Sequence, residues 1–143
     1  MTRIDFYTLA ADSSGDRFIF TCRLLERIRA EGLRVLVYCP ESEWARHLDR
    51  LLWTFREDGF LPHGLVGQVD AEFTPVLIGA DPRPPVPTDV LVNLALTPPD
   101  DLSPFARVCE PLDQTPSVLE AGRARYRHYR QLGHPLEHHQ VRL

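Results

Sequence analysis

Apolar residues recur with two different spacings along the first part of the chain. Residues 4–9 and 34–39 form short, nearly continuous apolar runs, which favour strands buried on both faces of a sheet. Between these runs, residues 16–31 carry apolar side chains at helical spacing, from Phe18 to Ile28. The pattern predicts a strand, a helix and a second strand, in that order.

The alternation of strand and helix continues through the rest of the chain. A second helix is expected over residues 40–55, where acidic residues occupy the first turn. Further strands are predicted at residues 75–79, 89–96 and 107–112, and a last helix at about 116–132. We therefore predict an α/β fold with a mostly parallel sheet flanked by helices, a nucleotide-binding-like (Rossmann-like) arrangement.

The length of the chain fits one domain. A chain of 143 residues can bury about 68% of the surface that it exposes when unfolded, so its core needs no disulfide or metal. Two proline-rich stretches, at residues 81–87 and 97–101, are too short to separate domains. We expect a single domain over residues 1–133, followed by a frayed tail over residues 134–143.

The cysteines and the hydropathy pattern indicate a cytoplasmic protein. Cys22, Cys39 and Cys109 are odd in number and lie in apolar stretches, as reduced core thiols of cytosolic proteins do. The chain opens directly on a predicted strand, and no secretory signal or membrane span is recognisable. We expect no membrane partner.

A nucleotide site is not predicted, although the fold class is typical of nucleotide-binding proteins. The loop after the first strand, residues 10–16, holds one glycine and two aspartates, and the chain contains no lysine. This composition excludes a Walker-type phosphate loop and gives no dinucleotide fingerprint. No nucleophile lies near His63 in the sequence, and His134, His138 and His139 fall in the expected tail. We predict no catalytic residues, no cofactor and no metal.

Charge is concentrated in the last predicted helix. Residues 121–143 hold five Arg and one Glu, a formal charge of +4, whereas residues 1–120 carry −8. In a helix, Arg123, Arg127 and Arg130 share one face with Tyr126 beside them, which suits a compact anionic ligand such as an acidic peptide. A solvated helix that pairs with the acidic body is the simpler alternative.

Two further alternatives remain at this point. The basic helix could grip phosphate in a small α/β enzyme or nucleotide-binding domain. It could also bind single-stranded nucleic acid directly by stacking bases on Tyr126 and Tyr129, although the acidic total charge argues against this.

Trp53 and Phe60 form a second candidate surface. They flank the polar turn at residues 56–59, which brings two large aromatic side chains to the end of a predicted helix. Aromatic residues at such a rim anchor protein interfaces, and a core position for Trp53 is an equal alternative on sequence alone.

The order of several segments resembles one protein family, the chi subunits of bacterial DNA polymerase III. The similarity runs from the first strand to about Gly133, and no single motif carries it. The segments are Phe6-Tyr7, residues 34–39, residues 48–55, residues 60–65, residues 89–94 and the Arg-x-Arg-Tyr-Arg-x-Tyr-Arg helix at 123–130.

The resemblance implies a non-catalytic member of the clamp-loader assembly that binds two protein partners. One is the acidic C-terminal tail of the single-stranded-DNA-binding protein, so that DNA is reached only indirectly. On the matching positions, the resemblance implies that Arg123, Tyr126 and Arg127 bind this tail and that Leu112 forms an apolar wall. Leu119 departs from a position that is basic in some relatives.

The other implied partner is the psi subunit of the polymerase. The resemblance places Trp53 and Phe60 on the psi-facing surface, which in the family also accepts a helicase. It further implies a nucleotide-binding-like sheet without a nucleotide, in agreement with the missing phosphate loop.

Overall fold

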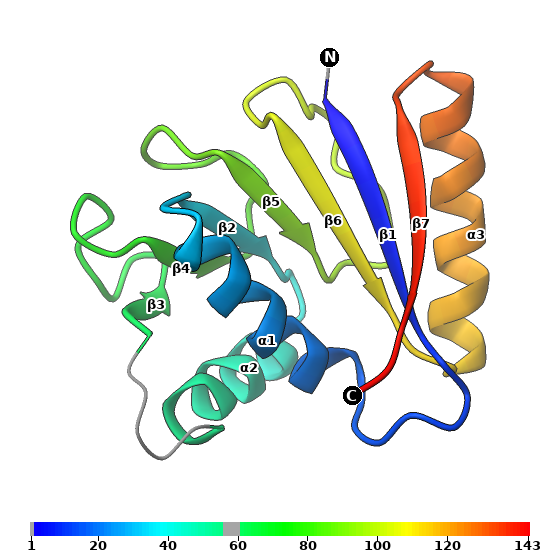
Figure 1. Cartoon of the computed structure of the whole chain (residues 1–143). Coiled ribbons are helices and arrows are strands. Elements are labelled where there is room, and N and C mark those ends of the chain that lie inside the picture. Colours follow the sequence, from blue (N-terminus) through cyan, green and yellow to red (C-terminus); the bar gives the residue numbers. More distant parts are fainter. Residues whose placement is uncertain (1, 56–60) are drawn as a thin grey trace.

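The computed structural model describes residues 2–55 and 61–143, which form one sheet of seven parallel strands (Figure 1). The order across the sheet is β3-β4-β2-β5-β6-β1-β7. The strands are β1 (Arg3–Leu9), β2 (Val35–Tyr38), β3 (His63–Leu65), β4 (Val76–Gly79), β5 (Val90–Asn93), β6 (Arg107–Leu112) and β7 (Leu136–Val141). The predicted α/β fold with a mostly parallel sheet is confirmed.

Helices α1 (Arg17–Ala30) and α2 (Ser42–Thr54) cover one face of the sheet (Figure 1). The Asp16 side chain caps α1 by accepting hydrogen bonds from the backbone N–H groups of Phe18 and Ile19, at 3.0 and 3.1 Å. The buried side chains of both helices pack against alternate residues of the strands, including Tyr7 and Val37. None of the described helices combines the length and apolarity needed to cross a membrane.

Helix α3 (Pro116–Gln131) covers the opposite face together with the loop at residues 97–106. Because successive residues of a strand point to opposite faces, Phe6 packs under α3 while its neighbour Tyr7 packs under α1. Helix α3 runs alongside β7 at the end of the sheet farthest from β3 (Figure 1). The hydrophobic core therefore consists of two layers, one on each face of the sheet.

The connections that leave β1 and β6 diverge to opposite faces. Strand β1 continues into α1 on one face, and its neighbour β6 continues into α3 on the other, which crosses over β1 to reach β7. In open α/β sheets, ligands bind at the carboxyl ends of strands where the connections diverge in this way. The fold thus points to the carboxyl ends of β1 and β6 as a site.

The structure corrects the expectation of a frayed tail at residues 134–143. Residues 136–141 form β7, which pairs in parallel with β1 from Ile4↔Leu136 to Leu9↔Val141. Strand β3 was also not predicted. Both are edge strands, and β7 has four consecutive polar residues, 137–140, with an apolar residue only at each end. Their pairing with a neighbouring strand, rather than a strong apolar pattern of their own, makes them strands.

Candidate functional site

A buried polar network fixes helix α3 to the sheet. Glu110 of β6 is completely buried and accepts hydrogen bonds from Asn93 Nδ2 at 2.9 Å, Arg125 Nε at 3.0 Å and the Tyr129 hydroxyl at 2.7 Å. Arg125 also donates from Nη1 to the carbonyl oxygen of Leu96 at 2.9 Å. Burial and the Glu110 carboxylate raise the pKa of Tyr129, so its hydroxyl remains a donor.

This network sets the rotation of α3. Arg125 and Tyr129 are four residues apart and point to the sheet, with exposed fractions of 2% and 1%. Arg123 and Arg127 are therefore exposed on the helix surface, whereas Tyr126 remains partly buried against the core. We predicted no role for Arg125 or Glu110 from the sequence; the available signal was a glutamate within an apolar strand and an arginine one turn before a tyrosine.

A pocket of about 400 Å³ lies beside α3 at the carboxyl ends of β1 and β6. Its apolar walls are formed by Phe6, Leu112, Leu119 and Tyr126. Its polar groups come from Thr8, Gln114, Arg123 and His138, among which Arg123 carries a permanent positive charge. An apolar hollow with one guanidinium group suits a ligand that joins an apolar side chain to a carboxylate.

Gly122 allows the close approach of α3 to β6 that shapes this pocket. A Cβ atom at Gly122 would lie 2.7 Å from Cδ1 of Leu112, which is too close for two carbon atoms. The ring of Tyr126 packs edge-on against Phe6, with centroids 5.2 Å apart. Leu112 and Tyr126 are therefore both closely packed in the apolar lining of the pocket.

The structure brings together three of the five residues that we predicted for this site. Leu112, Arg123 and Tyr126 all line the pocket. Arg127 and Arg130 are exposed on α3 and lie outside its lining. His138, to which sequence analysis gave no role, lies on the strand side of the pocket.

The loop where a nucleotide phosphate would sit in related folds is engaged by the chain itself. Asp16 caps α1, and Asp12 accepts a hydrogen bond from Arg142 Nη2 at 2.9 Å. The backbone N–H of Leu143 donates to Ser13 Oγ at 2.9 Å. These contacts place residues 142–143 against the loop, and its aspartates give it a negative charge that disfavours phosphate.

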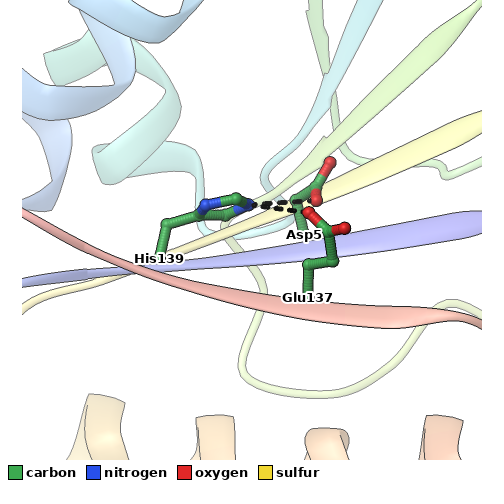
Figure 2. Close-up of side chains that lie close together, drawn as sticks. All are labelled: Asp5, Glu137 and His139. Carbon is green, nitrogen blue, oxygen red and sulfur yellow. Dashed lines mark hydrogen bonds and ion pairs between the residues drawn. The ribbon is translucent and has the colours of Figure 1, made fainter.

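Strand β7 is held to β1 by a cluster of charged side chains on the α1 side of the sheet. Figure 2 shows His139 pointing toward both Asp5 and Glu137, with Nε2 at 3.2 Å from Asp5 Oδ1 and 3.5 Å from Glu137 Oε2. The other oxygen of Asp5 accepts hydrogen bonds from Arg107 Nε at 2.8 Å and Arg3 Nε at 3.1 Å.

The cluster serves as an ion-pair network rather than a cation site. Burial raises the pKa of Asp5, but the hydrogen bonds from His139 and Arg107 outweigh it and hold the pKa below its usual value. Carboxylate and imidazole groups bind metals, yet two guanidinium groups already compensate the Asp5 charge and would repel a cation.

The second candidate surface lies around α2 and β3. The Trp53 side chain is 56% exposed, which removes the core alternative for this residue. Its ring meets that of His63 on β3 at a centroid distance of 4.9 Å. Val66, Val69 and Phe73 are also exposed, so large apolar side chains gather in the segment around β3. Phe60 lies outside the described residues.

The three cysteines are free and buried, as the sequence indicated. Burial raises the pKa of Cys22 and Cys109 to about 12 and that of Cys39 to about 11. The thiols are therefore protonated at neutral pH and contribute apolar volume to the core.

Comparison with known proteins gives a consistent result over almost the whole chain. Residues 1–137 match the family described as "DNA polymerase III chi subunit, HolC". The DNA polymerase III subunit chi of Pseudomonas aeruginosa is 36% identical over 141 residues, which covers 99% of this chain and 98% of that protein. The subunit chi of Escherichia coli is 30% identical over 138 residues, covering 93% and 94% of the two chains.

Proposed function

The chain belongs to the family of DNA polymerase III chi subunits, and from this premise we propose that it is a non-catalytic, cytoplasmic accessory subunit of the clamp-loader assembly. In this role it binds the acidic C-terminal tail of the single-stranded-DNA-binding protein in the pocket beside α3. It thereby links the polymerase to protein-coated DNA without touching DNA itself.

The observation that carries this proposal is the composition of the pocket. Arg123 supplies a guanidinium fork beside an apolar hollow lined by Leu112 and Tyr126. A tail that ends in an apolar residue can insert that side chain while its carboxylates face Arg123. The exposed Arg127 and Arg130 extend the positive charge along α3, where acidic residues further from the end of the tail would pass.

The surface around Trp53 is the proposed contact for the psi subunit. Four exposed apolar side chains between residues 53 and 73 give this end of the sheet the character of a protein interface: Trp53, Val66, Val69 and Phe73. A helicase that binds the same surface would compete with psi.

Titration with a synthetic acidic peptide that ends in a phenylalanine with a free carboxylate tests the tail site. We expect micromolar affinity that falls as salt rises, because the ion pairs are partly exposed. Arg123→Glu should reduce the affinity about tenfold or more by placing a repelling charge at the pocket. The matched control is Arg83→Glu in the proline-rich loop, where the Arg83 side chain is 84% exposed.

Two further titrations distinguish the tail site from a nucleotide-binding or nucleic-acid-binding site. A peptide without its last apolar residue should bind poorly, and an oligonucleotide or ATP should not bind with micromolar affinity. Equal binding of intact and shortened peptides, or equal loss in Arg83→Glu and Arg123→Glu, would refute the site. Tight ATP binding would instead support a nucleotide-binding domain, and tight oligonucleotide binding would support a direct nucleic-acid binder.

A further inference from the structure

The strand side of the pocket beside α3 carries an imidazole group. His138 of β7 pairs in register with Phe6, and its Nε2 lies 2.9 Å from Oγ1 of Thr8 on β1. The side chain of His138 is exposed and lines the same pocket as Arg123 and Tyr126. The pocket therefore has one permanent cation on the helix and one titratable group on the strands.

We propose that His138 is a second contact for the carboxylates of the bound acidic tail, and that its protonation strengthens tail binding as the pH falls toward 6. This inference rests on the proposed function of the pocket. Arg123 alone offers one guanidinium group, whereas a peptide end presents a terminal carboxylate and neighbouring acidic side chains. An imidazolium group on the strand side gives these carboxylates a partner away from the helix.

The residues around His138 leave the bound peptide as the source of negative charge beside its ring. From α3, Arg123 and Tyr126 line the same pocket; β1 contributes Phe6 and Thr8, and the segment at the end of β6 contributes Leu112 and Gln114. On β7 itself, Glu137 and His139 lie on the other face of the sheet with Asp5. None of the described lining residues is a carboxylate, so the peptide supplies the negative charge that favours the imidazolium form.

The contact with Thr8 orients the ring in both protonation states. A neutral imidazole with an unprotonated Nε2 accepts a hydrogen bond from the Thr8 hydroxyl, and the imidazolium donates from Nε2 to Thr8 Oγ1. In either case Nδ1, the other ring nitrogen, carries a proton in the imidazolium form, and the contact of Nε2 with Thr8 is kept. Because a bound carboxylate favours the imidazolium form, we expect peptide binding to be accompanied by proton uptake.

The test is calorimetric titration of the full chain with the acidic peptide, at about pH 8 and about pH 6.5, around the ordinary histidine range. We expect the affinity to rise about threefold toward the lower pH, the size of effect typical of an exposed ion pair. Repeating the titration in two buffers of different ionisation enthalpy should reveal uptake of a fraction of a proton per peptide.

Substitutions at position 138 test whether His138 causes the pH dependence of the affinity and the proton uptake. His138→Gln should lose both the rise in affinity and the proton uptake, because glutamine carries no charge at either pH. His138→Lys, with a fixed charge, should bind well at both pH values. The control is His128→Gln, an exposed histidine of α3 outside the pocket lining, which should behave as the wild type.

The outcomes distinguish this inference from the proposed function. Unchanged proton uptake in His138→Gln overturns the role of His138 while the tail site stands. Failure of the wild type to bind the peptide at either pH overturns both.

Discussion

The two ends of the sheet present different chemistry. At the β7 end, the hollow beside α3 combines Arg123 and His138 with apolar walls. At the β3 end, exposed side chains such as Trp53 and Phe73 are large and apolar. A recessed cationic pocket suits one extended acidic peptide, whereas exposed apolar side chains suit a folded partner. Because these surfaces lie at opposite ends of one sheet, the two proposed partners would not compete for the same surface.

The supports of these two ends differ as well. Helix α3 is attached by the buried hydrogen bonds among Glu110, Arg125 and Tyr129. Helix α2 buries the apolar residues Ala45, Leu48 and Leu52, and its polar contact with β3, Asp49 Oδ1 to His63 Nε2, is longer, at 3.4 Å, and partly exposed. Directional hydrogen bonds specify one rotation of a helix, while apolar packing tolerates small shifts. The proposed tail site needs the first kind of support, because the contact that we propose between a carboxylate and Arg123 depends on the position of this side chain.

The largest expected effect comes from breaking the support of α3. Arg125→Met leaves the Glu110 carboxylate buried without its cation, which should cost about 3 kcal/mol in the free energy of unfolding. For a chain of this size we expect the melting temperature to fall by about 10 °C. Thermal unfolding followed by circular dichroism measures both quantities.

A second substitution tests the cause of that loss. In the Arg125→Met background, Glu110→Gln removes the uncompensated charge and keeps an acceptor for the Tyr129 hydroxyl. Part of the lost stability should return, but affinity for the acidic tail should be below that of the wild type in both the single and the double variant, because α3 has lost the directional contact of Arg125 with Glu110. Recovery of full tail affinity would show that the network does not position the pocket.

The next effect concerns the apolar end. Trp53→Ala should weaken binding of the psi subunit by about 2 kcal/mol, or roughly thirtyfold, as for a central aromatic anchor. The stability of the chain itself should change by less than about 1 kcal/mol, because more than half of the side chain is exposed. Calorimetric titration with psi and thermal unfolding measure these two changes.

Leu132 provides a matched control for Trp53. It is exposed to the same extent, 56%, and it follows α3 at the other end of the sheet. Leu132→Ala should leave psi binding unchanged. An equal loss of affinity in both variants would contradict the assignment of the β3 end, and loss of a cooperative thermal transition in Trp53→Ala would show a structural role instead.

The smallest expected effect tests whether the peptide enters the hollow beside Gly122. Gly122→Ala pushes the added methyl group against Leu112, which must move toward the hollow. We expect affinity for the acidic tail to fall about threefold. The free energy of unfolding should hardly change, because overpacking lowers it and the higher helix propensity of alanine raises it, each by about 1 kcal/mol. Psi binding should stay constant, and Ala124→Ser on the exposed side of α3 is the control. Unchanged tail affinity in Gly122→Ala would mean that the peptide does not enter the hollow.

Sequence pattern was enough for the central part of the fold. The buried strands β1, β2 and β4 have continuous apolar runs, and α1 has a clear helical period, so each was found close to its observed bounds. Strands β3 and β7 were missed because an edge strand depends on its partner more than on its own composition. A pattern along one segment does not contain that long-range pairing.

Part of the candidate site, like part of the fold, could be predicted from the sequence. Helical spacing placed Arg123 beside Tyr126, and family resemblance added Leu112, which the structure brings to the same pocket. The role of Arg125 was hidden, because a basic residue among other arginines gives no sign that its side chain is buried against Glu110. His138 was hidden by the expectation of a frayed tail.

The position of β1 between β6 and β7 has a consequence for synthesis of the protein on the ribosome. Strand β1 leaves the ribosome before both of the strands with which it pairs in the described part of the chain, which begin at residues 107 and 136. Until those residues emerge, β1 has both of its edges open, and the face that carries Ile4 and Phe6 lacks its cover from α3, which invites aggregation. Chains that stop before residue 107 therefore lack any native partner for β1, and we expect them to be recognised by chaperones and proteases.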